Sequence, residues 1–156
     1  MLSHGVNLLS VRFNSGQSLL EIIVAVGVAV LLITGLVVGT SVSLRTSQYG
    51  QRRSQATKYA QEGIEILRSL RDSMDWDDFI ALDTNGSGAT SLCLGNDAVP
   101  VPGSNCESNL DTVFARQLLL EWNDADDRIE LTVIVSWPEG GQTPDVALDT
   151  YFTQWR

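Results

Sequence analysis

The stretch IIVAVGVAVLLITGLVVGTSVSL, residues 22–44, decides how this chain is built. It contains no charged side chain and no proline, and it is apolar on every face of a helix. Such a helix is about 35 Å long at about 1.5 Å per residue, enough to cross a hydrocarbon core about 30 Å thick. A core helix of a water-soluble domain needs only one apolar stripe. The stretch therefore predicts a membrane-spanning helix.

Downstream of Leu44 the helical period continues, but only one stripe remains apolar. The residues of this stripe recur three or four apart: Ala56, Ala60, Gly63, Ile64, Leu67 and Leu70. We expect one continuous helix from about Ser18 to Ser73. Residues 17–44 form its transmembrane part, and residues 45–73 form an amphipathic stem.

Residues 74–156 are expected to form a small head. The Asp-rich segment Asp72–Asp78 ends the helical pattern, and a region from Leu82 to Leu110, rich in Gly, Ser, Asn, Asp and Pro, predicts a loop. Beyond it the apolar residues alternate, which predicts strands. Three series alternate in this way: Leu118, Leu120 and Trp122; Ile129, Leu131, Val133, Val135 and Trp137; Val146, Leu148, Thr150 and Phe152. The polar Asn123–Asp127 predicts a hairpin turn.

Three antiparallel strands with one apolar face need a cover, and the apolar stripe of the stem can provide it. The expected fold class is α+β, with one long N-terminal helix packed on a small antiparallel sheet. The formal net charge of the chain is −9, and it is unevenly distributed: the stem is basic and the head is acidic. The acidic head argues against direct nucleic-acid binding, because its charge has the same sign as the phosphate backbone.

The chain has two cysteines, Cys93 and Cys106, in the loop-rich part of the head. Two thiols in such a stretch of an exported chain suggest one disulfide. Closing a loop of this length contributes about 3 kcal/mol. The alternative is a pair of free thiols in a cytosolic protein. The spacing fits no zinc motif, and the only histidine is His4.

The residues in front of the apolar run decide between several kinds of membrane segment. An ordinary secretory signal would be cut near Gly39–Ser43, but its apolar region is shorter than this one. An uncut signal anchor is the other simple interpretation. Neither explains why a carboxylate, Glu21, stands at the front of the apolar run behind Gly16-Gln17-Ser18-Leu19-Leu20.

The segment from Gly16 to Glu21, followed by Ile22-Ile23-Val24-Ala25, resembles the processing site of type IV pilins and type II secretion pseudopilins. That site has a glycine, a residue that is commonly Phe and here is Gln17, then Ser or Thr, two apolar residues and a glutamate. The stem segment Gln61–Glu65 and the ending Thr150–Trp155 are more similar to minor pilins than to major ones.

The resemblance implies that a prepilin peptidase removes residues 1–16 by cutting between Gly16 and Gln17, and that the new amino terminus, Gln17, is methylated. It also implies that Glu21 forms a salt bridge with the terminal amine of a neighbouring subunit when the helices bundle. The partners would then be membrane lipid before assembly, the peptidase, and other pilin subunits bound through the N-terminal helix. The head would be extracytoplasmic on a single-pass protein of the cell membrane, and later part of an extracellular filament.

One charge count opposes this topology. The leader has one firm positive charge, Arg12, whereas Arg45, Arg52, Arg53 and Lys58 follow the span. The positive-inside rule alone would place the stem in the cytoplasm. The cysteines, the acidic head and the processing motif favour export, and we expect the exported arrangement.

Signals for catalysis or a metal are weak in this sequence. The run DTNGSG, residues 83–88, matches the first half of a calcium loop, with Asp83, Asn85 and Ser87 as candidate ligands. The glutamate that closes such loops is replaced by Leu94, so we expect a flexible turn and no metal. There is no phosphate loop, and loss of the leader would remove His4. We therefore expect no cofactor and no enzymatic activity.

The leading hypothesis is a structural, minor subunit of a type IV pilus-like or pseudopilus filament, with roles in assembly, adhesion, secretion or DNA uptake. One alternative is a monomeric, membrane-anchored extracellular binding domain that is not built into a filament. Another is a small secreted hydrolase that uses carboxylates. Only the acidic clusters Asp72–Asp78 and Asp124–Asp127 support this alternative.

Overall fold

The computed structural model describes residues 15–84, 88–107 and 110–154, with the backbone alone for residues 15–18. The chain divides into two compact units, Met1–Ser47 and Gln48–Arg156. Helix α1, Ser15–Ser73, contributes to both units. The expectation of one helix without a break between the apolar segment and the stem is confirmed.

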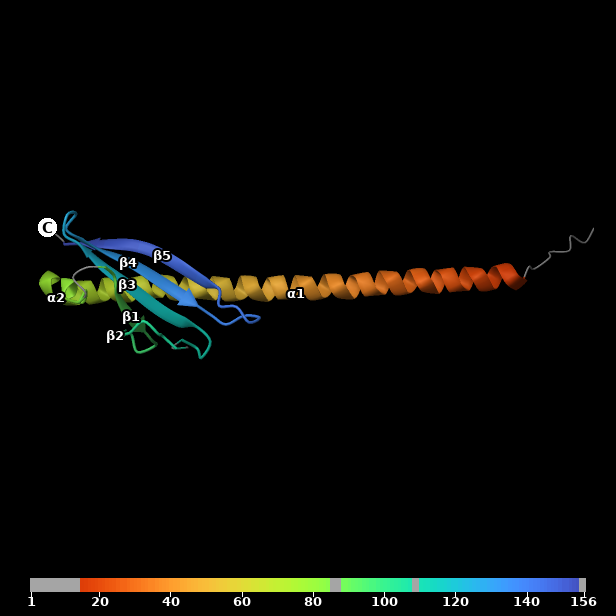
Figure 1. The fold of residues 1–156 in the computed structure, drawn as a ribbon, viewed down its shortest axis with the longest axis horizontal. Helices are drawn as coiled ribbons and strands as arrows, with labels where there is room; N and C mark the ends of the chain where they lie inside the picture. Colours follow the sequence, from red (N-terminus) through yellow and green to blue (C-terminus); the bar gives the residue numbers. More distant parts are fainter. Residues whose placement is uncertain (1–14, 85–87, 108–109, 155–156) are drawn as a thin grey trace, which may run out of the picture. The chain divides into compact units, whose positions relative to one another are not determined.

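The second unit consists of the stem of α1, a short helix and one antiparallel sheet (Figure 1). Its other elements are α2 (Trp76–Ile80), β1 (Thr90–Leu94), β2 (Pro100–Pro102), β3 (Ala115–Asn123), β4 (Arg128–Ser136) and β5 (Asp145–Thr153). The strand order is β2-β1-β3-β4-β5, and every neighbouring pair is antiparallel. The predicted α+β class is confirmed.

The core forms between one face of the sheet and the apolar stripe of the stem. Ala56, Ala60 and Leu67 of α1 are fully buried, and Ile64 and Leu70 are partly buried against the same cluster. From the sheet and its flanks, the cluster contains Leu92, Leu94, Leu118, Leu120, Ile129, Leu131, Val133, Val135, Trp137 and Phe152. The alternation that predicted β3, β4 and β5 therefore identifies the side of each strand that faces the helix.

The region predicted as a loop, Leu82 to Leu110, contains two further strands, so that prediction is wrong in part. Strand β1 is only five residues long and pairs with both β3 and β2. Strand β2 has three residues, two of them prolines, a composition that strands tolerate only at a sheet edge. Such short strands are set by their neighbours more than by their own sequence, and short-range alternation does not detect them.

Two turns give the hairpins their connections. Between β3 and β4, the side-chain Oδ1 of Asn123 accepts hydrogen bonds from the backbone N–H groups of Ala125 (3.2 Å) and Asp126 (3.3 Å). This confirms the predicted turn at Asn123–Asp127. Between β4 and β5, Gly140 and Gly141 both have positive φ, 59° and 82°, as a tight two-residue hairpin turn requires.

Gly63 is the point at which the stem comes nearest to the sheet. A Cβ atom at this position would lie 3.1 Å from Cδ of Arg116 and 3.1 Å from Cγ1 of Val133. The helix therefore needs its smallest residue here, although glycine costs about 1 kcal/mol in a helix relative to alanine. Gly50, also in the stem, has no atom within 4 Å of the corresponding position.

Replacement of Gly63 by leucine should lower the free energy of unfolding by about 1–3 kcal/mol, because the added side chain must push the sheet away from the helix. Gly50→Leu is the matched control, since it brings the same gain in helix propensity without a clash. Urea unfolding of both full-length variants in detergent micelles would measure the difference. Equal stability of the two variants would contradict the close approach at Gly63.

Candidate functional site

The apolar part of α1 is exposed on every side within the first unit. All side chains from Leu19 to Ser47 are exposed, and the large apolar ones between Leu19 and Leu44 are 51–74% exposed. Among the residues that the structure describes, α1 is the one helix long and apolar enough to cross a membrane. So much apolar surface is stable only in lipid or against other proteins.

Several hydroxyl groups in and just after this segment donate hydrogen bonds within the helix. Thr34, Ser41 and Thr46 each donate to the carbonyl four residues earlier, with oxygen–oxygen distances of 2.8, 2.9 and 3.1 Å. Thr40 donates to the carbonyl of Val37 at 3.0 Å. In a bilayer an unsatisfied hydroxyl is costly, and this arrangement avoids that cost.

Glu21 is the only charged residue between Leu19 and Leu44. Its neighbours along the helix are apolar, and it contributes to a shallow hollow of about 490 Å³ with Leu20, Val24 and Ala25. Within the described part of the chain no cation contacts this carboxylate. A carboxylate at the edge of an apolar surface is stabilised by a positive group from outside the helix.

Gly16 and Gln17 lie in the first turn of α1, where only the backbone is described. The residues in front of Ser15 lie outside the described part. Cleavage between Gly16 and Gln17, and methylation of Gln17, therefore stay predictions. A peptidase that binds an extended backbone would need this first helical turn to unwind, which glycine makes easier.

In the head, Arg116 joins the stem to the sheet. Its side chain is fully buried, and its guanidinium donates to the carbonyl oxygens of Tyr59 (2.9 Å), Leu94 (3.1 Å) and Gly95 (3.1 Å). The carboxylate of Glu62 on the stem lies 3.6 Å from Nη1 of Arg116. Burial lowers the pKa of Arg116, and Glu62 opposes that shift. The guanidinium thus links the helix, the end of β1 and strand β3.

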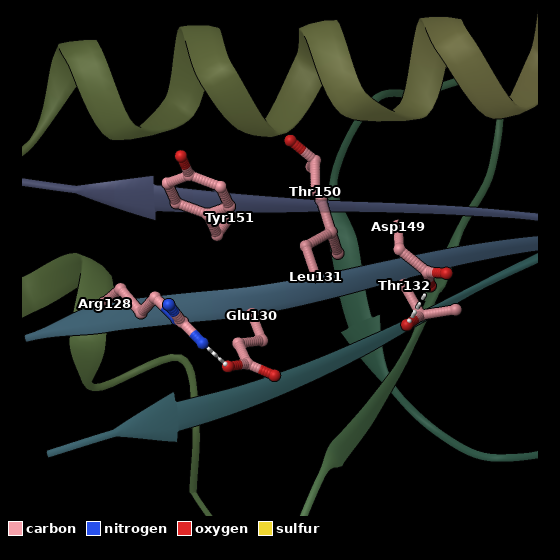
Figure 2. Close-up of a pocket in the computed structure, with 7 residues that line it drawn as sticks. All are labelled: Arg128, Glu130, Leu131, Thr132, Asp149, Thr150 and Tyr151. Carbon is pink, nitrogen blue, oxygen red and sulfur yellow. Dashed lines mark hydrogen bonds and ion pairs between the residues drawn. The ribbon is translucent and has the colours of Figure 1, made fainter. Parts of the chain in front are cut away.

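The face of the sheet that points away from the core carries a polar hollow over β4 and β5 (Figure 2). The hollow has a volume of about 380 Å³. Its lining residues are Arg128, Glu130, Leu131, Thr132, Asp149, Thr150 and Tyr151. Arg128 and Glu130 pair along β4, and Thr132 and Asp149 pair across β4 and β5, so the hollow is a shallow surface whose charged groups already have partners.

Three contacts hold the charged side chains of this hollow in place. The Arg128 guanidinium donates to Oε1 of Glu130 at 2.7 Å and lies 5.6 Å from the centroid of the Tyr151 ring. Thr132 donates to Oδ1 of Asp149 at 2.7 Å. The hydrogen bond from Arg128 holds the pKa of Glu130 below its usual value, with a smaller contribution from Asn123. The same contacts therefore favour the ionised form of Glu130.

The candidate calcium ligands are only partly described. Asn85 and Ser87 lie outside the described residues. Asp83 uses Oδ1 to accept a hydrogen bond from the Thr90 hydroxyl (2.5 Å) and Oδ2 to accept one from the Trp122 backbone N–H (2.9 Å). In this structure Asp83 ties the segment before β1 to the end of β3, and a calcium site stays an untested alternative.

Cys93 and Cys106 form a disulfide, with their Cα atoms 5.3 Å apart. Cys93 lies on β1, and Cys106 lies beyond β2, so the bond encloses the β1–β2 hairpin. This confirms the predicted pairing. Gly103, which follows β2 inside the closed loop, donates its backbone N–H to the carbonyl of Ser91 at 3.0 Å. This bond holds the end of β2 against β1.

The acidic clusters proposed as possible catalytic groups are exposed. Asp72, Asp75, Asp77 and Asp78 are exposed around α2, and Asp124–Asp127 occupy the β3–β4 turn. Across residues 15–84, 88–107 and 110–154, no three acidic, histidine or cysteine side chains come together in a way that could hold a metal ion. His4 lies outside those ranges.

Sequence reasoning missed the role of Arg116. The sequence did contain a signal for this role. Arg116 lies two residues before Leu118, in the same alternating series as Leu120 and Trp122, and so falls on the core side of β3. A charged residue in an inward position needs partners. Its carbonyl partners come from segments 21 to 57 residues away in sequence, which no local pattern identifies.

Comparisons with known proteins add no relative: no family model, no curated protein and no solved structure matches this chain.

The Arg128–Glu130 pair predicts a specific pH dependence of stability. Because the folded-state pKa of Glu130 is lowered, the pair stabilises the fold above the ordinary glutamate pKa of about 4.3, and this contribution is lost as the pH falls through the lower folded-state value. Glu130→Gln should therefore lose less stability than the wild type between about pH 5 and pH 3.

Urea midpoints of the full-length protein in detergent at several pH values would test this. Glu107→Gln, which removes an exposed carboxylate outside the sheet, serves as the control. Parallel pH profiles for wild type and Glu130→Gln would contradict a stabilising role of the pair.

Proposed function

We propose that this chain is a structural subunit, of the minor type, in a type IV pilus-like or pseudopilus filament. It is inserted in the cell membrane, processed by a prepilin peptidase at Gly16, and assembled by bundling of its N-terminal helix with those of other subunits. The head is extracytoplasmic before assembly and lies on the extracellular filament afterwards. The filament serves adhesion, secretion or DNA uptake, and the acidic head does not itself contact DNA.

The single observation that carries the proposal is the position of Glu21. The carboxylate stands at the front of a segment that is apolar and exposed on every face, directly after the processing-like residues Gly16–Leu20. A monomeric anchor has no use for a charge at this position, since a charge there only raises the cost of insertion. In a bundle of helices, the same charge can pair with the amino terminus of a neighbour and fix the stagger between them.

The architecture of the helix supports the same interpretation. One helix supplies both the apolar segment and the stem on which the sheet packs. An ordinary signal peptide would be removed and would leave the stem without its apolar extension. Since the stem carries part of the head core, the apolar segment and the head belong to one mature protein in this proposal.

Cleavage is the first test. Gly16→Val should leave an uncut precursor in the native host, because the added branched side chain hinders binding of the extended backbone by the peptidase. The intact mass of the purified protein measures the result. Gly27→Val, a glycine in the apolar segment with nothing within 4 Å, is the matched control and should be cut normally.

A mature mass that begins near Ser43, or a mass that Gly16→Val does not change, would contradict processing at this site.

Assembly is the second test. Glu21→Gln removes the charge and keeps the shape of the side chain, so the variant should still insert and be cut but should be reduced at least tenfold in the sheared extracellular fraction. Immunoblots of sheared and membrane fractions would measure the ratio. Glu65→Gln, an exposed stem carboxylate paired with Arg68, is the control.

If the wild-type protein stays wholly in the membrane fraction after shearing, the anchored-monomer alternative replaces the filament.

A further inference from the structure

The two edges of the head sheet differ in a way that the filament proposal does not use. The first edge is β2, and the second is β5. An open edge presents unpaired backbone N–H and C=O groups and can accept another strand. Which backbone groups point outward follows from the hydrogen bonds that flank each strand pair, because these alternate along an antiparallel ladder.

The β2 edge cannot easily accept a strand. Gly103 donates its N–H to the carbonyl of Ser91, so the pairs Ser91–Gly103 and Cys93–Val101 are the hydrogen-bonded ones. Pro100 and Pro102 therefore direct their backbones outward. Neither has an N–H group, and a strand that approached this edge would find no donor along the length of β2.

The β5 edge is open over its whole length. Trp137 donates its N–H to the carbonyl of Pro144, and this pair continues the register of β4 with β5. By alternation, Val146, Leu148, Thr150 and Phe152 direct their backbone groups to β4. The opposite set, Asp145, Ala147, Asp149, Tyr151 and Thr153, directs its backbone groups outward, and all five residues are exposed. Within the described residues these outward groups make no backbone hydrogen bond to a loop or turn.

The side chains along this edge specify the chemistry of a partner. On the outer face Asp145 and Asp149 are exposed and lie four residues apart, opposite Ser136 and Thr132 of the neighbouring strand. On the core side Val146 and Leu148 are only partly buried. An added strand would meet carboxylates on one face and uncovered apolar carbon on the other.

A second copy of the same edge does not fit this surface. Full antiparallel pairing of β5 with another β5 would place Asp149 opposite Asp149, and parallel pairing in register would do the same for both aspartates. Like charges directly opposite each other in a sheet are destabilising. Strand β5 also lacks the proline and lysine residues that commonly block edges against other chains.

From this asymmetry we infer that the β5 edge is a docking site for an extended segment of another protein, one with an apolar residue at every second position and a basic residue at every fourth. The partner strand adds to the sheet as its sixth strand. Its backbone bonds to the outward groups of Ala147, Asp149 and Tyr151. Its basic side chains, four residues apart, lie against Asp145 and Asp149, and its apolar side chains extend the core beside Val146 and Leu148.

The test uses the full-length protein in detergent micelles and a labelled synthetic peptide, acetyl-KVTVKVTVK-amide, with fluorescence anisotropy as the readout. We expect saturable binding that weakens at least tenfold when the three lysines are replaced by glutamates. On the protein, Asp149→Lys should weaken binding of the lysine peptide and strengthen binding of the glutamate peptide. No saturable binding of the lysine peptide, or equal binding of both peptides, overturns the inference.

Backbone pairing needs its own variant, because charge alone could attract the peptide to the acidic head. Ala147→Pro removes an N–H that points outward and costs no bond to β4, so the fold should survive. It should weaken binding about tenfold, whereas the matched control Ala147→Thr keeps the donor and should bind as the wild type does. Equal binding by Ala147→Pro and wild type overturns strand addition.

Hydrogen exchange gives a second, independent measurement. In the free protein the amides of Ala147, Asp149 and Tyr151 should exchange much faster than those of Val146, Leu148 and Phe152. Saturating lysine peptide should slow the first set selectively. Uniform protection, or protection at β2 instead, would place the contact elsewhere. None of these results bears on the filament proposal, because the substitutions at Ala147 and Asp149 leave Gly16 and Glu21 unchanged.

Discussion

The fold of the head depends on the close contact between the stem of α1 and the sheet. The contact is lined by small residues, Ala56, Ala60 and Gly63. At Gly63 the helix backbone lies so close to the sheet that an added Cβ atom would be 3.1 Å from side-chain atoms of Arg116 and Val133. Close packing of this kind leaves no room for water and makes every polar group inside it dependent on protein partners. Arg116 meets that requirement by donating to carbonyl groups on both sides of the contact. The charge of Arg116 is balanced from the rim by Glu62.

The side-chain pattern of the same helix changes along its length. In the first unit its side chains are apolar all round and uncovered, while in the second unit only one stripe is apolar and the sheet covers it. No proline or capping residue marks the change between the two, because the backbone hydrogen bonds of a helix are the same in lipid and in water. What changes is the side-chain pattern alone, and this is why the transition can be read directly from the residues around Leu44.

Long periodic segments were predictable from the sequence, and contacts between distant segments were not. The helix, the β3–β4–β5 meander and its core-facing residues follow from apolar periods of 3.6 and 2. Strands β1 and β2 escaped prediction because they are short and gain their stability from β3 and from the Cys93–Cys106 bond. Of the candidate site, the disulfide was predicted from residue type and position, whereas the role of Glu21 stays a prediction. The hollow over β4 and β5, and the open edge of β5, depend on strand register, which the sequence does not specify by itself.

The arrangement around Arg116 has a mechanical consequence. In the proposed filament the subunit would carry tension, and a pull along the stem would shear it past the sheet. Hydrogen bonds to Leu94 and Gly95 hold the guanidinium of Arg116 in the sheet, while its hydrogen bond to Tyr59 and its ion pair with Glu62 lie across that shear plane and would be loaded together. Bonds loaded in parallel resist force better than bonds broken one after another. The buried arginine would then resist sliding of the sheet along the helix.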